Sequence, residues 1–410
     1  MERGRYVFLM LAALAATMPL TSAADDEALR HARELLRETI LVDGHNDLPW
    51  AVRTDKRAQG DAALYDLRGE APGNTDIERL KRGGLGAQFW SVYIPGELAG
   101  GFARTQLEQI DIARQIVARY PETFRLTGTV AEIRVAHREG RIASLLGIEG
   151  GHAIENSLGA LRAYYDLGVR YMTLTHNAHT DWADSAALPP KHGGLTQFGE
   201  EIVLEMNRLG MLVDLSHTSD GTMDDALRVS KAPVIFSHSS ARALCDTPRN
   251  VPDDILKRVA RNGGVVMITF VAGFIDPEVS RVQAPAMAEV KRRTEGKTIE
   301  EGERISAEIM SRVKAPQVTI AQVADHIEHV RKVAGVQHIG IGADYDGNSL
   351  WPEGLGDVST YPNLFAELIR RGWSDEDLKL LAGENVLRAL AKAEETARTL
   401  RARQAVGSRL

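Results

Sequence analysis

The chain has 410 residues, of which 44% are hydrophobic and 26% are charged, and this balance excludes a largely disordered protein. Its formal net charge of −7 argues against a nucleic-acid partner, because phosphate binding requires a basic surface. The single cysteine, Cys245, excludes a disulfide framework and any metal site built from cysteines. A metal ion would therefore have to be held by His, Asp and Glu.

The N-terminal segment has the composition of a secretory signal peptide. A short net-positive start precedes an apolar stretch over residues 6–20, and small residues follow at 21–24. The apolar stretch is too short for a comfortable membrane span, and the C-terminus carries no apolar tail. We therefore expect removal of residues 1–23 as a signal peptide. The remaining residues 24–410 would form a periplasmic or secreted protein without a membrane anchor.

Eight short apolar stretches alternate with segments in which apolar residues recur at helical spacing. The stretches are 40–44, 85–92, 142–148, 169–175, 211–216, 233–237, 264–270 and 338–343. This alternation predicts an α/β protein with a parallel sheet. Eight such units predict a (β/α)8 TIM barrel that forms a single domain over residues 24–410.

Two regions add to the barrel pattern. Residues 277–316, after the seventh apolar stretch, are charged and helix-forming, and we expect a helical insertion at the C-terminal face of the barrel. A solvated surface excursion would have the same composition. After the eighth stretch, residues 363–371, 375–382 and 385–401 are expected to form extra C-terminal helices.

Side chains that bind metals follow six of the eight stretches, at the strand ends that meet at one face of a barrel. They are His45, Asp47, Glu149, His176, His217, His238 and Asp344. Imidazoles and carboxylates without thiolates suit Zn2+ or a similar first-row ion, and one tetrahedral ion would not use them all. The sequence therefore predicts two metal ions in the barrel mouth, with Glu149 as the most central bridging ligand.

Four further histidines lie on predicted helices, away from the strand ends. They are His31, His137, His326 and His329. Histidines on helices are often solvent-exposed, so we expect these four at the surface and outside the metal site.

The strand-end residues lie in motifs that resemble those of the membrane (renal) dipeptidase family, zinc peptidases of the amidohydrolase-like barrel superfamily. The matching segments are 42–49, 147–152, 171–176, 182–184, 213–217, 236–241, 249–253 and 342–347. The similarity runs from about residue 36 to residue 392. It implies a zinc-dependent dipeptidase.

The resemblance implies a metal-binding role for five residues. His45 and Asp47 would bind one zinc ion. His217 and His238 would bind the other, and Glu149 would bridge the two.

Three more residues would act on the substrate. His176 would contact the scissile carbonyl, Arg249 would clamp the terminal carboxylate, and Asp344 would be the acid/base instead of a ligand. The implied reaction is attack of a metal-bridging hydroxide on the peptide bond of a dipeptide, including one with a C-terminal D-residue. Members of the family are often homodimers, and no feature of this sequence decides whether the chain pairs with a second copy.

Two other functions stay open. Other hydrolases on this scaffold act on N-acyl amino acids, cyclic amides or β-lactams, and many bridge their metals with a carboxylated lysine on the fourth strand. The stretch 169–175 has no lysine, and the His-x-His of deaminase barrels is replaced by His45-Asn46-Asp47. A non-catalytic exported binding protein would be expected to have lost ligands, and none is missing.

Overall fold

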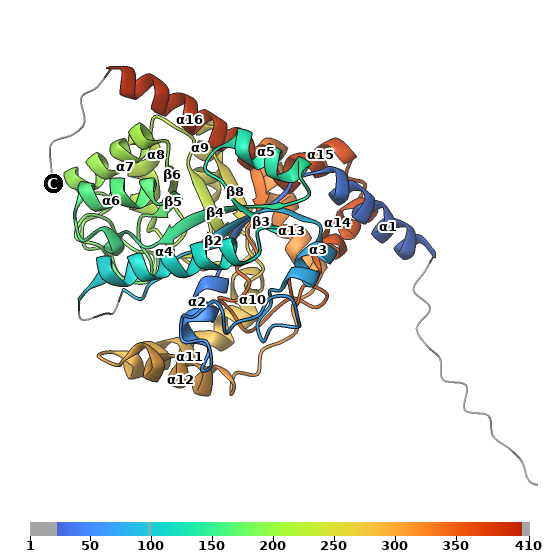
Figure 1. Ribbon diagram of the computed structural model, residues 1–410, viewed down its shortest axis with the longest axis horizontal. Coiled ribbons are helices and arrows are strands. Elements are labelled where there is room, and N and C mark those ends of the chain that lie inside the picture. Colours follow the sequence, from blue (N-terminus) through green and yellow to red (C-terminus); the bar gives the residue numbers. More distant parts are fainter. Residues whose placement is uncertain (1–22, 97, 99, 404–410) are drawn as a thin grey trace, which may run out of the picture.

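The computed structural model describes residues 23–96, 98 and 100–403. Within these residues, eight parallel strands close into a barrel that helices surround (Figure 1). The strands of this ring are β1 (Leu41–Asn46), β2 (Leu85–Ser91), β4 (Ile142–Glu149), β5 (Val169–Thr173), β6 (Leu212–Asp214), β7 (Ile235–Ser239), β8 (Val265–Ile268) and β9 (Ile339–Ile341). Each strand overlaps one predicted stretch, which confirms the (β/α)8 barrel. The expected signal peptide, residues 1–23, lies outside the described residues except for Ala23.

Parallel pairing continues around the whole ring. β1 pairs with β2, β2 pairs with β4, and each later strand pairs with the next. β9 closes the ring on β1, where Ile341 lies opposite Asp43. Every residue of β1, β2 and β4 is buried, as expected for parallel strands covered on both faces. All strands therefore end at one face, the mouth of the barrel.

A further strand, β3 (Phe124–Leu126), lies outside the ring and was not predicted. It pairs with Ile142–Ser144 at the start of β4, and β5 pairs with β4 from Leu146 onward. β3 therefore extends the edge of β4 that β5 leaves free.

The helices form the outer layer of the molecule. They are α1 (Ala23–Glu38), α2 (Leu48–Thr54), α3 (Ile77–Gly83), α4 (Phe102–Arg119), α5 (Val130–Arg138), α6 (Leu158–Asp166), α7 (Gln197–Leu209), α8 (Asp220–Val229), α9 (Asp253–Asn262), α10 (Ala272–Ile275), α11 (Pro277–Thr294), α12 (Ile299–Met310), α13 (Ile320–Ala334), α14 (Tyr361–Arg370), α15 (Asp375–Lys379) and α16 (Asn385–Arg403). Local capping sets many of their limits. In α7, Thr196 accepts a hydrogen bond from the Gly199 backbone N–H, and Gly210 ends the helix with a φ of 84°. No helix in the described part of the chain is both long enough and apolar enough to cross a membrane.

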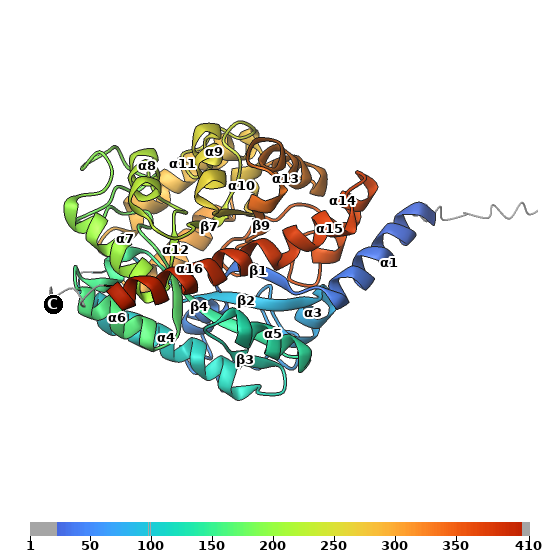
Figure 2. The same ribbon diagram turned by 90° about the horizontal axis from the view of Figure 1, so that it is seen from above.

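Helix α16 closes the end of the barrel opposite the mouth. Its Val386, Leu387, Leu390 and Ala393 pack in one cluster with apolar residues from the first halves of the ring strands. Figure 2 shows α16 lying across the barrel, with the other helices around it. The barrel interior is therefore packed at this end, and the polar site is confined to the other.

The insertion at residues 277–316 forms α11 and α12, which confirms the predicted helices. Figure 1 shows the two helices beside α2 and α10, on the side of the barrel away from α16. Trp50 of α2 donates a hydrogen bond from Nε1 to Glu303 Oε1 of α12, at 3.2 Å. Ile305 and Ile309 of α12 are buried. The insertion therefore packs beside the mouth, as expected.

Candidate metal centre

The seven predicted strand-end residues converge at the mouth of the barrel. His45, Glu149 and His238 lie within β1, β4 and β7, and Asp47 is the residue before α2. His176, His217 and Asp344 follow β5, β6 and β9. The five expected metal ligands are buried, whereas His176 and Asp344 are partly exposed. Their ligand atoms form three groups, each within 4.8 Å: His45, Glu149 and His238; Glu149, His176 and His217; and His45, Asp47 and Asp344.

The carboxylate of Glu149 lies at the centre of these groups, with its two oxygens directed to different neighbours. Oε1 is 3.0 Å from His217 Nε2 and 3.3 Å from His238 Nε2. Oε2 is 3.6 Å from His45 Nε2, which in turn is 3.3 Å from Asp47 Oδ2. A carboxylate that divides its oxygens in this way can bridge two metal ions.

The charges in the centre favour metal-binding protonation states at Glu149, His217 and His238, whereas Tyr171, Glu149 and Asp47 outweigh burial at His45 and raise its pKa well above the ordinary value. Burial alone would raise the pKa of Glu149, but the surrounding imidazoles, led by His45 and His176, lower it well below its ordinary value. Burial lowers the pKa of His217 and His238 well below the ordinary value of histidine. The centre therefore offers an ionised carboxylate and two neutral imidazoles, as metal binding requires.

Several buried atoms of the centre lack the partners that such atoms need. Among the described residues, His45 Nε2 and Asp47 Oδ1 have no hydrogen-bond partner. His217 Nε2 and His238 Nε2 face each other at 2.9 Å. Acceptor atoms brought this close need a cation or a shared proton between them. The donor set of imidazoles and carboxylates fits divalent first-row metals.

Two of these residues have left-handed backbone conformations. His217 has a φ of 63° and Asp344 a φ of 70°, values that residues other than glycine rarely adopt. Such a conformation costs on the order of 1–3 kcal/mol, so other contacts must hold it. Thr175 Oγ1 donates to the His217 carbonyl at 3.0 Å, and the Asp344 N–H donates to the His45 carbonyl at 3.1 Å. Both bonds tie the segment to a neighbouring strand end.

Asp344 faces the metal ligands, and a glycine leaves room for it. A Cβ atom on Gly347 would lie 2.3 Å from Asp47 Oδ2 and 2.6 Å from Asp344 Oδ1. Burial raises the pKa of Asp344 well above its ordinary value, and the nearby Asp47 carboxylate adds to this effect. The position of Asp344 suits a proton carrier, and its distance from His45 and Asp47 suits a third ligand as well.

Asp346 lies only two residues further on and has a different role. Its Oδ1 accepts a hydrogen bond from the Asn74 backbone N–H at 2.6 Å, and its own N–H donates to Asn74 Oδ1 at 3.1 Å. This pair ties the 73–75 loop to the segment after β9. Asp346 therefore anchors a loop, and of the two aspartates only Asp344 faces the expected metal ligands.

Arg249, in the loop between β7 and α9, is a buried guanidinium with free donors. Its Nη2 donates to the His238 carbonyl at 3.4 Å, and the group lies 4.9 Å from the centre of the Phe274 ring. Nε and Nη1 have no hydrogen-bond partner among the described residues. Burial lowers the pKa of Arg249 to about 10, so it still carries its charge at neutral pH. A buried cation with unused donors is suited to an anionic group of a ligand.

His176 lies between the metal ligands and an aromatic wall. Its Nε2 is 3.8 Å from Glu149 Oε1, and its ring centre lies 4.3 Å from that of His217. On its other side, Tyr93 lies 4.9 Å away, and Trp50 packs edge-on against Tyr93. His176 can therefore reach a ligand that also contacts this wall.

Two residues behind the ligands carry no role in the sequence analysis. Tyr171 Oη lies 2.8 Å from His45 Nδ1, and Ser237 Oγ lies 2.8 Å from His238 Nδ1. Both residues lie in the motif segments 171–176 and 236–241, but only the fold shows that they contact His45 and His238. The sequence signal was a polar residue at an otherwise apolar strand position.

The prediction of a surface position is wrong for His326. The side chain is buried: its Nδ1 accepts from the Ala241 backbone N–H at 3.1 Å, and its Nε2 lies 2.9 Å from the Ile275 carbonyl oxygen. The residue is on α13 and satisfies one backbone group of the loop after β7 and one of helix α10. Its role is structural.

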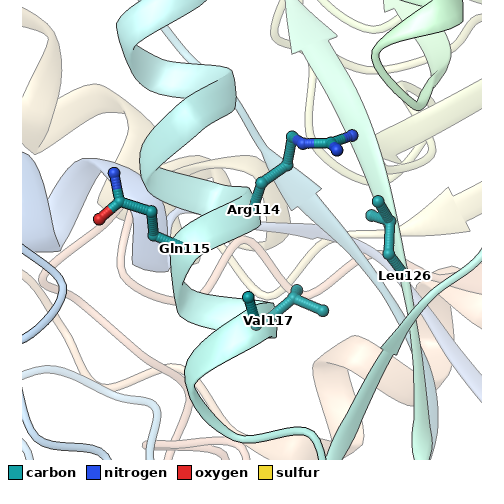
Figure 3. A pocket seen from close by; sticks show the side chains of 5 residues that line it. Arg114, Gln115, Val117 and Leu126 are labelled. Carbon is teal, nitrogen blue, oxygen red and sulfur yellow. The ribbon is translucent and has the colours of Figure 1, made fainter.

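A hollow on the outside of the molecule is separate from this centre. Figure 3 shows it between α4 and β3. Its volume is about 330 Å3. It is lined by Arg114, Gln115, Val117, Ala118 and Leu126. These side chains include neither an imidazole nor a carboxylate, so the hollow has no metal-binding chemistry.

Comparison with known proteins places the chain among peptidases. A family model for membrane dipeptidase (peptidase family M19) matches residues 29–404. A probable dipeptidase, PvdM from Pseudomonas aeruginosa, is 24% identical with a TM-score of 0.78, covering 91% of this chain and 100% of that one. A metallo peptidase from Rhodobacter sphaeroides, liganded with a phosphinate mimic of L-Ala-D-Ala, is 25% identical with a TM-score of 0.71, covering 87% of this chain and 99% of the other.

Proposed function

The chain belongs to the membrane dipeptidase family, peptidase family M19, and is a metal-dependent peptide-bond hydrolase; from this premise we propose that it uses two zinc ions to cleave dipeptides. The observation that carries the two-ion proposal is the division of the Glu149 oxygens between two groups of ligands. His45 and Asp47 would hold one ion, and His217 and His238 would hold the other. When bound, such ions polarise a carbonyl group and lower the pKa of a water molecule.

Asp344 carries the proton in this reaction. Its carboxylate accepts a proton from the attacking water and transfers it to the nitrogen of the leaving amino acid. Burial raises the pKa of this carboxyl group above its ordinary value, which strengthens its hold on the proton that it accepts from water and then passes on. His176 donates a hydrogen bond to the carbonyl oxygen as negative charge develops there.

Arg249 gives the selectivity for dipeptides. Its unused Nε and Nη1 donors can hold a carboxylate through two parallel hydrogen bonds. A substrate whose terminal carboxylate is fixed there presents its last peptide bond to the centre. In a tripeptide that bond joins the second and third residues, so the N-terminal side would have to accommodate an extra residue. We expect cleavage to fall sharply from dipeptides to tripeptides.

Substrates with a C-terminal D-residue form part of the proposal. The Rhodobacter sphaeroides relative binds a mimic of L-Ala-D-Ala, which supports this stereochemistry at a site of the same family. The test is hydrolysis of L-Ala-D-Ala, L-Ala-L-Ala and L-Ala-L-Ala-D-Ala by the zinc-loaded protein. Cleavage of the first but not of the tripeptide is expected. If no dipeptide is cleaved but an N-acyl amino acid, a cyclic amide or a β-lactam is, the dipeptide proposal is wrong.

We also propose that the protein is exported. The support is the order of charged, apolar and small residues over residues 1–23. The test is N-terminal sequencing of the protein recovered from the periplasm and the medium of expressing bacteria. A new N-terminus near residue 24 is expected, and an intact N-terminus in the cytoplasm would contradict the proposal.

A further inference from the structure

We infer, resting on the proposed function, that Asp214 acts through Ser237 to hold His238 in its metal-binding tautomer and so sets the affinity of one of the two metal positions. Neither Asp214 nor Ser237 is a ligand in the proposed site. Both are positioning residues, because they act on the metal only through His238.

Asp214 is a buried carboxylate that joins three strands. It is the last residue of β6. Its Oδ1 accepts from the backbone N–H groups of Ser216 and Ser237, at 3.1 and 2.8 Å. Its Oδ2 accepts from the hydroxyls of Thr173 and Ser237, both at 2.6 Å. The carboxylate thus fixes the hydroxyl of Ser237 from the side opposite to the metal centre.

The direction of these hydrogen bonds determines where the proton of His238 lies. All four hydrogen bonds of the Asp214 carboxylate come from donors, so the single hydrogen of the Ser237 hydroxyl is directed to Asp214 Oδ2. At the 2.8 Å contact with His238 Nδ1, Ser237 Oγ must then be the acceptor, and Nδ1 must carry the proton. The lone pair of Nε2 therefore faces Glu149 Oε1, 3.3 Å away, and His217 Nε2, 2.9 Å away.

The other buried histidine with a partner behind it lacks a carboxylate there. His45 Nδ1 contacts Tyr171 Oη at 2.8 Å, and that hydroxyl donates to the Gly44 carbonyl at 3.2 Å. This chain also leaves Nε2 free for a metal, and its hydroxyl hydrogen is directed to a neutral carbonyl group, although Ser237 and the Asp214 carboxylate lie close enough to Tyr171 to act on it. A carboxylate behind an imidazole makes the imidazole a stronger ligand and fixes its orientation. The two metal positions should therefore depend differently on Asp214.

Thr173 offers a matched control. It donates to the same Asp214 oxygen as Ser237, at the same distance of 2.6 Å, and it is buried as well. Among the described residues, its hydroxyl makes no hydrogen bond to an expected metal ligand. Ser237→Ala and Thr173→Val each remove one hydrogen bond from Asp214 Oδ2, but only Ser237→Ala breaks the path to His238.

The experiment is a titration of the metal-free protein with Zn2+ against a competing chelator, without peptide. In wild type we expect two ions per chain. In Ser237→Ala the position held by His238 should lose roughly 10- to 100-fold in affinity, and the other position should lose less, because Ser237 acts on His45 only through Tyr171. In Thr173→Val both affinities should match wild type. Equal affinities in Ser237→Ala and wild type, or an equal loss in Thr173→Val, would overturn the inference, as would a single zinc site in wild type.

A second measurement does not depend on how well a variant folds. In 15N-histidine spectra of metal-free wild type, His238 should be protonated at Nδ1 and not at Nε2. Its signals are assigned by their absence from His238→Gln. A proton on Nε2 would overturn the inference. Because neither experiment uses a substrate, a protein that shows both results but cleaves no dipeptide would contradict the proposed function and leave this inference standing.

Discussion

At the scale of single residues, Asp344 and Asp346 are identical side chains with different roles, one at the proposed site and one in holding a loop. Asp344 shares the mouth with His45 and Asp47, whereas Asp346 holds the 73–75 loop through Asn74. Both carboxylates have raised pKa values, mainly because each is largely shielded from water. The partners of each side chain, and not its charge or burial, separate the two roles.

This contrast can be tested by one substitution at each position. On the proposed mechanism, Asp344→Asn should bind the same two zinc ions as wild type and lower kcat by roughly 100-fold or more, because it removes the proposed proton carrier. Asp346→Asn should keep most of the turnover and lower the melting temperature, because it weakens the hold on the loop. The measurements are bound zinc, kcat and thermal unfolding. Loss of an ion from Asp344→Asn would show that Asp344 is a ligand.

A second prediction concerns Arg249. Arg249→Lys keeps the charge but loses the planar pair of donors, so KM for a dipeptide should rise by roughly 10- to 100-fold. Arg228 of α8 forms ion pairs with Glu200 and Asp225 away from the mouth and serves as the control. Arg228→Lys should leave KM unchanged. Equal KM values for Arg249→Lys and wild type would show that Arg249 does not bind the substrate carboxylate through a planar pair of donors.

The strand-end residues could be predicted because a parallel barrel brings them together whatever their distance along the chain. His326 and Asp214 could not be placed in this way. His326 is buried because it satisfies Ala241 and Ile275, which are far from it in sequence. Asp214 acts through contacts to Thr173 and Ser237 on neighbouring strands. A side chain whose role depends on partners from other elements gives no local signal.

At the scale of elements, burial decides which strands were predictable. The ring strands are covered on both faces, so they stand out as apolar stretches. β3 has three residues with Arg125 at its centre, and only pairing with β4 makes it a strand. The insertion was predictable as helix from its composition, but its contact with α2 through Trp50 and Glu303 was not.

The closure of the barrel by α16 gives a prediction at this scale. Leu390 is buried among strand residues at the end away from the metal centre. Leu390→Ala should lower the free energy of unfolding by about 2–5 kcal/mol, with metal content and KM unchanged. The exposed Lys392 on the same helix is the control, and Lys392→Ala should change stability by less than about 0.5 kcal/mol. Urea unfolding measures both. A loss of metal from Leu390→Ala would mean that the two ends of the barrel are coupled.

For the whole molecule, buried neutral histidines set how stability depends on pH. Burial lowers the pKa of His326 to about 4, from 6.5 in the unfolded chain. Between these two values the unfolded chain binds more protons than the folded one. The free energy of unfolding therefore falls as the pH drops through this window. Once the pH is below 4, His326 accounts for a loss on the order of 3 kcal/mol in the free energy of unfolding.

His326→Gln removes this dependence. The variant should be less stable than wild type at pH 7, because it loses the shape of the imidazole. Its free energy of unfolding should fall less steeply between pH 6.5 and pH 4. Urea unfolding at several pH values measures the difference, and comparison with wild type cancels the other titrating groups. Parallel pH profiles would contradict the burial of a neutral His326.

We propose that the strand-end residues of one barrel hold two metal ions that together hydrolyse dipeptides. This is tested most directly by titrating metal-free residues 24–410 with Zn2+ while measuring bound zinc and hydrolysis of L-Ala-D-Ala. We expect turnover to reach its maximum at two ions per chain, with Glu149 shared between them. Full turnover at one ion per chain, or two bound ions without turnover of any dipeptide, would contradict it.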